Sequence, residues 1–313
     1  MSASGNLKVG FVGIGNMGQP MASHLVRAGW DVAVYDADLA KAAAFAAAQG
    51  CGHAGSLAEL GARTDVVVLM LPDGRIVRRV VLGKDGAGDH LLAGMAAGGT
   101  LIDMSSSAPV GTRALGAELA QRGYGLIDAP VSGGVKGALA GTLAIMVGGD
   151  EALAARFDAL LSAMGRRFHV GSLGSGHAVK VLNNYVSAAG LAAAAEALLI
   201  AQRFGIDGTV LVDVLNASTG RNNSTENKFK QYVLNNAYDS GFSLDLMVKD
   251  IRLAMEVAEA CGARAELGHS TLDIWEAARS WTGANADHTE FARFILEEAP
   301  VATAAVDKAK APA

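Results

Sequence analysis

The stretch from His177 to Phe204 most constrains the fold, because it contains no proline, only one internal glycine and many alanine and leucine residues. This composition predicts one continuous helix about 40 Å long. A helix of that length does not fit inside a compact α/β unit, so two domains are expected. We place them at residues 1–173 and 174–300, with the long helix at about residues 177–204.

Short apolar runs alternate with helical stretches before this helix, which predicts a doubly wound, mostly parallel α/β sheet covered on both faces. The runs are Leu7–Val12, Val32–Tyr35, Val66–Leu71, Thr100–Ile102, Leu126–Ile127, Thr142–Val147 and Phe168–Val170. After the long helix the patterns are helical only, and an all-α domain is expected. The helical stretches are Val210–Asn216, Ser224–Leu234, Leu244–Cys261, Ser270–Trp281 and Asp287–Glu298. The tail, residues 301–313, is Ala, Lys and Pro with almost no bulky apolar group, so we expect it to be disordered.

Charge and cysteine content exclude several classes of partner. With 26 basic and 31 acidic residues, the chain has no positive surplus to neutralise a phosphate backbone, which argues against nucleic acid. The two cysteines are too few for a disulfide framework, and the histidines show no metal-ligand spacing, so we predict a reducing, cytoplasmic location and no metal. The N-terminus does not have the pattern of a signal peptide, and Glu196 interrupts the apolar helix, so no membrane partner is expected.

A glycine motif directly follows the first predicted strand and opens a helix. It consists of Gly13, Ile14, Gly15, Asn16, Met17 and Gly18. Glycines at this spacing allow a tight turn, close approach of the backbone to a pyrophosphate, and close packing of helix and strand. The motif predicts a dinucleotide site, although glycine-rich turns also serve structural roles and similar loops occur in methyltransferases.

Asp36 ends the next strand, eighteen residues after Gly18. A carboxylate there accepts hydrogen bonds from the ribose hydroxyls of NAD and repels the 2′-phosphate of NADP. No Lys or Arg follows until Lys41, so NAD is favoured over NADP. The alternative is that Asp36 is a solvated turn residue. Two further strand ends, at Leu71-Pro72 and at Ser105-Ser106-Ser107, could line the same crevice or be simple loops.

Two more groups of residues suggest chemistry. Ser132, Gly133 and Gly134 form a turn that can present backbone N–H groups and a hydroxyl to a carboxylate, though such turns are often only loops. Lys180 and Asn184 lie one turn apart on one face of the long helix. A buried lysine can relay a proton during hydride transfer, whereas an isolated helical lysine is more often a surface residue. His177 precedes them on roughly the same side and is interpreted as a structural or capping residue.

Later segments are less specific. Lys249 and Asp250 begin an amphipathic helix and could be a solvated charge pair. The polar break at residues 216–223, which contains Arg221, could face a polar substrate or be a satisfied loop.

Four motifs in this order resemble the β-hydroxyacid dehydrogenase family, typified by 3-hydroxyisobutyrate dehydrogenase. They are GIGNMGQPMASHL at residues 13–25, DAPVSGG at 128–134, GHAVKVLNN at 176–184 and KDIRLA at 249–254. The resemblance covers residues 7 to 298. It implies a Rossmann domain, a long interdomain helix, an all-helical C-terminal domain, and a homodimer or homotetramer built largely through the helical domains.

The same resemblance implies roles for individual residues. Lys180 would be catalytic, with Asn184 ordering it and the turn Ser132-Gly133-Gly134 holding the substrate carboxylate. Leu71, Pro72 and Ser106 match cofactor positions, Lys249 matches one near the nicotinamide, and Phe242 and Asp250 match positions that line the substrate cleft. Three differences from relatives stand out: Ser106 replaces a common Thr, Ile76 replaces a cofactor-contacting Asn of some relatives, and the aromatic just after the arginine of similar enzymes is missing after Arg221.

The expected function is NAD-dependent oxidation of a small 3-hydroxy acid of the 3-hydroxyisobutyrate, 3-hydroxypropionate or L-serine type, with Lys180 as general acid/base. One alternative is reduction of small semialdehydes such as tartronate or succinic semialdehyde. A cofactor-binding pseudoenzyme scaffold and an imine reductase are disfavoured because Lys180 is present, and 6-phosphogluconate dehydrogenase is disfavoured because the chain is short.

Overall fold

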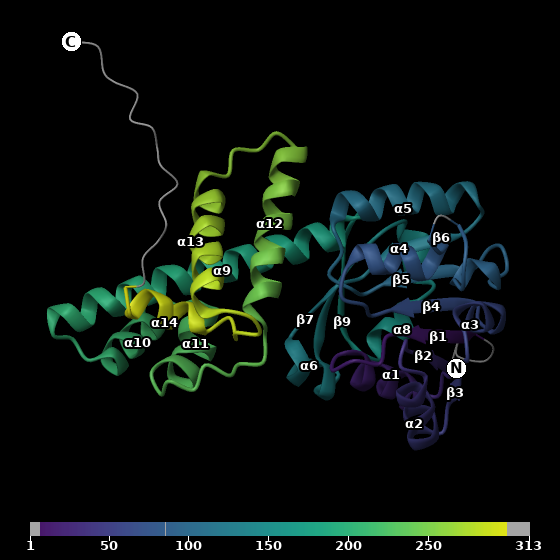
Figure 1. Ribbon diagram of the computed structural model, residues 1–313, viewed down its shortest axis with the longest axis horizontal. Coiled ribbons are helices and arrows are strands. Elements are labelled where there is room, and N and C mark those ends of the chain that lie inside the picture. The colour runs from purple at the N-terminus through teal and green to yellow at the C-terminus, as the bar shows by residue number, and fades with distance from the viewer. Residues whose placement is uncertain (1–6, 85, 299–313) are drawn as a thin grey trace, which may run out of the picture. The chain divides into compact units, whose positions relative to one another are not determined.

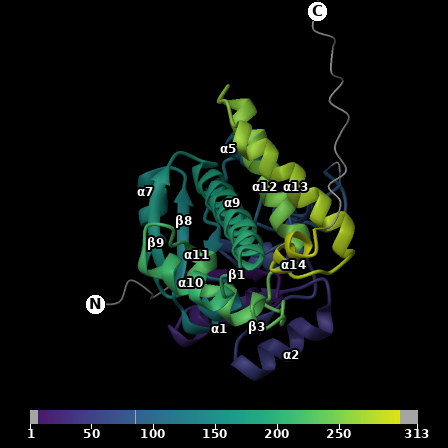
Figure 2. The same cartoon turned by 90° about the vertical axis from the view of Figure 1, so that its left-hand side faces the viewer.

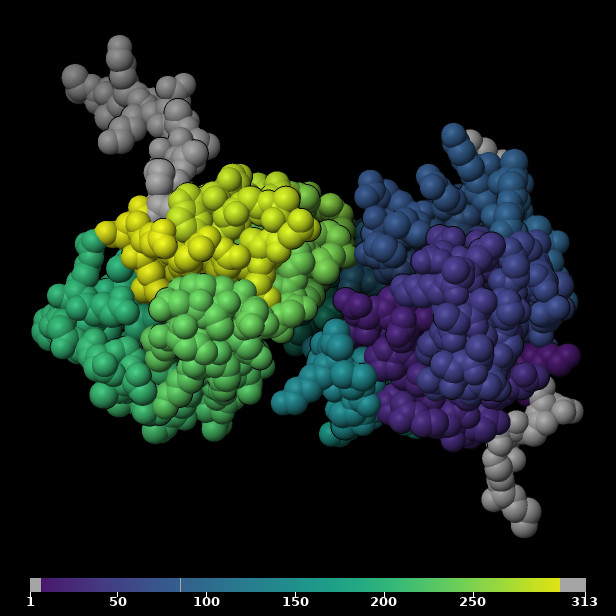
Figure 3. All heavy atoms as spheres, turned by 60° about the horizontal axis from the view of Figure 1, so that its bottom comes forward, coloured from purple at the N-terminus to yellow at the C-terminus, as the bar shows by residue number. Residues whose placement is uncertain are grey.

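The computed structural model describes residues 7–84 and 86–298, which fall into two compact units. Unit 1 is Met1–Val181 and unit 2 is Leu182–Ala313. The two units carry purple-to-teal and green-to-yellow colours in Figure 3. Helix α9 (Ser175–Phe204) is 30 residues long and links them, as the proline-free stretch predicts. The division falls eight residues after the boundary proposed at 173/174, because the first turns of α9 belong to unit 1.

Unit 1 is built on one nine-stranded sheet of order β3-β2-β1-β4-β5-β6-β8-β7, with β9 paired to β8. The strands are β1 (Lys8–Val12), β2 (Asp31–Tyr35), β3 (Gly52–His53), β4 (Val66–Leu69), β5 (Thr100–Asp103), β6 (Gly125–Asp128), β7 (Val131–Ser132), β8 (Leu143–Gly148) and β9 (Gly165–Gly171). All pairs from β3 to β6 are parallel, whereas β8 runs antiparallel to β6 and β7. The order reverses between β1 and β4, so loops after these strands meet at a topological switch point.

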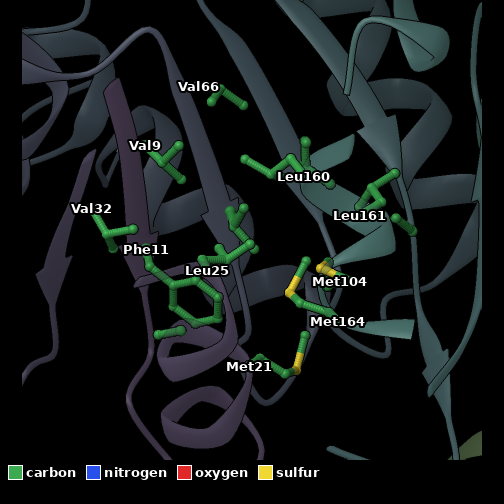
Figure 4. Packing of buried hydrophobic residues seen from close by; sticks show 14 of the residues in the cluster. Val9, Phe11, Met21, Leu25, Val32, Val66, Met104, Leu160, Leu161 and Met164 are labelled. Carbon is green, nitrogen blue, oxygen red and sulfur yellow. The ribbon is translucent and has the colours of Figure 1, made fainter. Parts of the chain in front are cut away.

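Helices cover both faces of this sheet because its central strands are apolar on both sides. On one face, Met21 and Leu25 of α1 and Leu160 of α8 pack with Val9 and Val66 (Figure 4). The other face packs a second core that includes residues of α3, α4 and α5. Figure 1 shows α4 and α5 on the side of the sheet opposite to α1 and α2. The predicted doubly wound α/β domain is confirmed.

The helices of unit 1 and its connections are short. They are α1 (Gly18–Arg27), α2 (Leu39–Gln49), α3 (Leu57–Arg63), α4 (Gly74–Leu82), the 3-10 turn η1 (Leu91–Ala93), α5 (Pro109–Gln121), α6 (Gly134–Ala140), α7 (Glu151–Ala155) and α8 (Asp158–Ser162).

Unit 2 consists of helices, and its described residues contain no strand. After α9 come α10 (Gly208–Ala217), α11 (Asn223–Asn227), the π-helix η2 (Phe229–Val233), α12 (Leu244–Ala260), α13 (Glu266–Thr282) and α14 (Glu290–Leu296). Helices α12 and α13 run side by side (Figures 1 and 2). Trp275 of α13 stacks on Phe291 of α14 with ring centroids 4.2 Å apart, at the centre of the core. The predicted all-helical domain is confirmed.

Helix α9 is also the one helix among the described residues that is long and apolar enough to cross a membrane. Length and composition carry little weight here, because α9 supplies Ala188, Leu191 and Ala195 to the buried cores of unit 2.

The structure departs from the sequence predictions at short or irregular elements. Strands β3 and β7 have two residues each and were not predicted. The helix expected at Ser224–Leu234 is a short α-helix followed by a π-helix, and the last helix begins at Glu290 rather than Asp287. The tail at 301–313 lies outside the described residues.

Candidate active site

The glycine motif lies where β1 ends and α1 begins, at the switch point of the sheet. Gly13 has φ +98°, and a Cβ on it would come 2.2 Å from the carbonyl oxygen of Met70. A Cβ on Gly18 would come 1.8 Å from the Gly13 carbonyl oxygen, whereas one on Gly15 would meet nothing within 4 Å. Gly13 and Gly18 are therefore required by the turn itself, and the space over Gly15 is open, which fits close approach by a pyrophosphate.

The start of α1 differs from the starts of the next three helices. Helices α2, α3 and α4 begin with Asp38, Ser56 and Asp73, whose side chains accept hydrogen bonds from first-turn N–H groups. Helix α1 begins at Met17 without a side-chain cap and has no acidic residue in its first turn. Its N-terminal N–H groups thus lack a side-chain acceptor, as expected where a bound anion supplies one.

Asp36 stands directly after β2 and touches the glycine loop. Its Oδ2 accepts a hydrogen bond from the backbone N–H of Ile14 at 2.8 Å, and its Oδ1 accepts one from Asp38 N–H at 3.0 Å. Lys41 Nζ is 3.9 Å from the carboxylate. Asp36 is thus part of the loop that would hold the cofactor rather than a solvated turn residue, and its carboxylate has lone pairs left for further donors.

The loops after β4 and β5 are joined by one serine. The backbone N–H of Leu71 donates to Ser105 Oγ at 3.0 Å, and Ser107 Oγ donates to Asp103 Oδ2 at 2.7 Å. Ser105 and Ser107 are buried, while Ser106 between them is partly exposed. The two flanking hydroxyls therefore hold the loop, and Ser106 is the serine of the three that a ligand can reach. Pro72 follows Leu71 in the same junction.

The Ser-Gly-Gly turn joins the last residue of β7, Ser132, to the first residue of α6, Gly134. Gly133 has φ +127° and Gly134 has φ +60°, conformations that side chains rarely adopt. Ser132 is partly buried, and a Cβ on Gly134 would meet nothing within 4 Å. The turn therefore exposes backbone where a small carboxylate could approach.

Lys180 lies on α9, within unit 1, and only 9% of it is exposed. The preceding turn of the helix is fixed to the ends of β5 and β6. Asp128 at the end of β6 accepts hydrogen bonds from the backbone N–H groups of Gly174 and His177 at 2.8 and 2.7 Å. Lys180 is thus carried by a helix anchored to the carboxyl edge of the sheet.

Unit 2 contributes a group of polar side chains from α9 and α12. Asn184 Nδ2 donates to Asp250 Oδ2 at 2.6 Å, and Asn184 Oδ1 accepts from Asn183 Nδ2 at 3.1 Å. Lys249 Nζ lies 3.5 Å from Asp250 Oδ1. Asp250 is only 1% exposed, so it is not the solvated member of a surface pair. It fixes Asn184, which stands one helical turn after Lys180.

A second polar cluster of unit 2 was not predicted from the sequence. Asp287 accepts hydrogen bonds from the backbone N–H groups of Gly241 and Phe242, and Lys228 Nζ lies 2.7 Å from His288 Nε2. The His288 N–H and Nδ1 both contact the Phe242 carbonyl oxygen, and its ring meets the Phe242 ring edge-on at 5.5 Å. This cluster holds the backbone on either side of Phe242.

Burial and hydrogen bonding set the charges in this cluster. Burial lowers the pKa of Lys228 to about 8, although Asp287 works against that shift. Burial also lowers the pKa of His288. Burial would raise the pKa of Asp287, but hydrogen bonds from His288 and Thr289 hold it well below its usual range. His288 is therefore neutral and lies between the ammonium of Lys228 and the carboxylate of Asp287.

The loop at residues 216–223 is largely self-satisfied. Asn222 Oδ1 accepts from the N–H groups of Ser224 and Thr225 and so caps α11. Arg221 is exposed and pairs with Glu226 at 3.6 Å. Asn183, Ser187 and Asn222 line a small hollow of about 130 Å³ on this side of α9.

A metal ion has no visible site in the residues that the structure describes. No three His, Cys, Asp or Glu side chains gather there in a way that could hold a metal ion, and Cys51 and Cys261 are free thiols.

Two family models match the chain. Residues 8–197 match the NAD-binding domain of 6-phosphogluconate dehydrogenase, and residues 174–295 match the NAD-binding domain of NADP-dependent 3-hydroxyisobutyrate dehydrogenase.

Characterised relatives cover nearly the same span. The chain is 35% identical over 277 residues to 2-(hydroxymethyl)glutarate dehydrogenase of Eubacterium barkeri, covering 88% of this chain and 90% of the relative. It is 37% identical over 276 residues to an NAD-dependent L-serine dehydrogenase of Pseudomonas aeruginosa, covering 86% and 91%. A solved structure of Mycobacterium tuberculosis 3-hydroxyisobutyrate dehydrogenase with L-serine superposes with a TM-score of 0.82 at 37% identity, covering 94% and 99%.

Proposed function

Because the chain belongs to the β-hydroxyacid dehydrogenase family, whose members are NAD(P)-dependent enzymes acting on CH–OH, we propose that it oxidises a small 3-hydroxy acid to its semialdehyde with Lys180 as general acid/base. The observation that carries the proposal is the burial of Lys180 on the anchored first turns of α9. A lysine without a role is seldom buried to this degree.

A bound NAD would supply the hydride acceptor for the carbinol carbon of the hydroxy acid. The neutral amine of Lys180 takes the hydroxyl proton as the carbonyl forms, and in the reverse direction the ammonium returns it. Asn184, fixed by Asp250, orders the helix face that carries Lys180. Lys249 belongs to the same group through its pairing with Asp250 and is assigned to the nicotinamide end.

The substrate proposed is a small unphosphorylated acid. Ser132, Gly133 and Gly134 supply a hydroxyl and backbone N–H groups for one carboxylate, and the family resemblance assigns Phe242 to the substrate cleft. A phosphorylated acid would need a cluster of basic side chains. The named relatives act on 2-(hydroxymethyl)glutarate and L-serine, and 3-hydroxyisobutyrate, 3-hydroxypropionate and L-serine are the first candidates for this enzyme.

NAD is the proposed cofactor because Asp36 places a carboxylate beside the glycine loop. Gly13–Gly18, Leu71, Pro72 and Ser106 form the remainder of the proposed cofactor site.

We also propose a homodimer or homotetramer in the cytoplasm. In unit 2, the end of α9 and the start of α10 expose large apolar side chains, with Phe204 83% exposed, Ile200 67% and Val210 55%. A second copy is the natural cover for such a surface. Sedimentation of the native protein and of the Phe204→Asp variant would measure this association.

The decisive experiment replaces Lys180 by Ala. We expect kcat to fall about 10²- to 10⁴-fold, the usual range for acid–base catalysis, while the affinity for NADH stays unchanged. Lys230→Ala is the matched control, since Lys230 is an exposed lysine paired with Asp213. Ordinary turnover by a folded Lys180→Ala variant would remove the catalytic assignment of Lys180, whereas a native protein that binds NADH but shows no turnover would be a cofactor-binding scaffold.

Direction is a separate question. Reduction of tartronate or succinic semialdehyde uses the same residues in reverse. Initial rates in both directions at neutral pH, over a panel of acids and semialdehydes, decide between hydroxy-acid oxidation and semialdehyde reduction.

A further inference from the structure

His177 is a completely buried histidine in the first turn of α9, and residues from three other segments of unit 1 meet its ring. Its Nε2 lies 3.1 Å from the carbonyl oxygen of Ser105, after β5. Its Nδ1 lies 2.9 Å from Thr112 Oγ1, on α5. Two buried carboxylates flank the ring, with Asp103 3.7 Å from Nε2 and Asp128 3.6 Å from Nδ1.

This arrangement excludes a direct chemical role for the imidazole. Both ring nitrogens have protein partners and no part of the side chain reaches solvent. A carbonyl oxygen only accepts hydrogen bonds, so Nε2 carries the hydrogen that it donates to Ser105. Any role of His177 in the reaction must therefore be indirect, through the residues that its ring contacts and through the helix to which it belongs.

On one side the partners lead to the loops proposed to hold the cofactor. The carbonyl oxygen of Ser105 accepts a hydrogen bond from His177 Nε2, and Ser105 Oγ accepts one from the Leu71 N–H. One residue thus joins the β4 loop, the β5 loop and the imidazole.

On the other side the ring is fixed to the helix that carries Lys180. The His177 backbone N–H donates to Asp128, and a Cβ on neighbouring Gly176 would come 2.2 Å from the Met146 carbonyl oxygen. The helix start therefore has no room to shift along the sheet. Lys180 follows His177 by three residues, less than one turn.

We propose that His177 is a positioning residue that locks the start of α9 to the cofactor loops and thereby sets the place of the Lys180 amine. The inference rests on the proposed catalytic role of Lys180. Small displacements of an acid–base group lower turnover without weakening ground-state binding. Loss of His177 should therefore lower kcat and leave KM almost unchanged.

The test is a double-mutant cycle between His177→Leu and Lys180→Ala. Leu fills the space but bonds to neither Ser105 nor Thr112. We expect His177→Leu to lower kcat about 10- to 100-fold, with KM for NAD and for the hydroxy acid changed less than about twofold. In the Lys180→Ala background, His177→Leu should lower kcat no further, because both changes remove the same function.

Two further variants keep the test independent of folding. His177→Gln, whose amide can donate to Ser105 and accept from Thr112, should restore most of the turnover. Thr112→Val removes one ring partner at nearly constant shape and should lower kcat in the same sense by a smaller factor. His90→Gln is the control, because His90 is a half-buried histidine of unit 1 that caps η1.

The outcomes separate the two hypotheses. If Lys180→Ala loses turnover while His177→Leu and Thr112→Val keep it, or if the losses of His177→Leu and Lys180→Ala multiply, the positioning role is wrong and the proposed function stands. If Lys180→Ala turns over normally, the proposed function itself is wrong.

Discussion

The two units offer different kinds of groups to a ligand, backbone in unit 1 and side chains in unit 2. In unit 1 the glycine loop and the Ser-Gly-Gly turn offer mainly backbone, and their glycines allow close approach. In unit 2 the corresponding surfaces are side chains, Asn184 with Asp250 and Lys249, each held by another side chain. Backbone groups are fixed by the local turn, whereas buried polar side chains depend on partners from distant segments.

This difference teaches where single substitutions should act. Removing one side chain beside a backbone-built site leaves most of its donors in place. Removing one member of a buried side-chain network takes one hydrogen bond from each of its partners, which costs about 1–3 kcal/mol per group. The unit 2 network should therefore be more sensitive to single truncations than the loops of unit 1.

Among the substitutions that test this comparison, Asp250→Ala is expected to have the largest effect. Asp250→Ala removes the acceptor of Asn184 and the ion-pair partner of Lys249, so we expect kcat to fall about 10- to 100-fold, the equivalent of about 1–3 kcal/mol. Asp250→Asn keeps an acceptor oxygen and should lose less. Steady-state kinetics are the measurement, and Asp245→Ala, an exposed aspartate of the same helix, is the control. A normal kcat for the Asp250→Ala enzyme would show that the side-chain network of unit 2 is not especially sensitive to single truncations.

Asp36 tests how the backbone-built loop of unit 1 responds to the loss of one side chain. Asp36→Ala should raise KM for NAD about tenfold, because the backbone donors remain and the loss stays at the lower end of the about 1.5–3 kcal/mol that a hydrogen bond to a charged group contributes. The preference for NAD over NADP should be lost. Paired assays with both cofactors measure this, with Asp38→Ala as the control because Asp38 caps α2 without being assigned to the cofactor. If the unmodified enzyme works better with NADP, the reading of Asp36 is wrong.

The same division explains what the sequence could predict. The glycine motif, the strand alternation and the spacing of Lys180 and Asn184 are local patterns, and they predicted the fold class and residues to examine, while the family was inferred from the resemblance of four motifs. The partners of those residues are not local. Asn184 and Asp250 are 66 residues apart, and His177 and Ser105 are 72 apart, so only the folded chain brings them together.

The cluster of Lys228 and His288 had no sequence signal at all. The two residues are 60 apart, and neither belongs to a motif of known spacing. The π-helix that begins next to Lys228 likewise interrupts a pattern that is helical throughout. Two-residue strands such as β3 and β7 are too short for an alternating pattern to be recognised.

Ser132 should show a smaller effect. Ser132→Ala removes one hydroxyl beside the backbone donors of Gly133 and Gly134, so KM for the hydroxy acid should rise about 3- to 10-fold, as for one hydrogen bond of about 1 kcal/mol. Because the carboxylate is held equally in the ground and transition states, kcat should change less. KM for NAD is the internal control. A fall in kcat with unchanged KM would place Ser132 at the reacting atoms instead.

The last prediction concerns the stability of unit 2 at alkaline pH. With its pKa lowered to about 8, Lys228 is neutral in the folded protein above that pH, while in the unfolded chain it holds its proton up to about pH 10.5. The unfolded state then binds more protons, so the contribution of Lys228 to the free energy of unfolding rises between pH 8 and 10.5. Urea unfolding at pH 7 and 9.5 measures this, with Lys228→Met subtracting the titration of every other group. The native protein should gain stability relative to Lys228→Met over this interval. A constant difference between the two would mean that Lys228 keeps an ordinary pKa. Burial in the cluster of Lys228 and His288 would then not control the charge of this lysine.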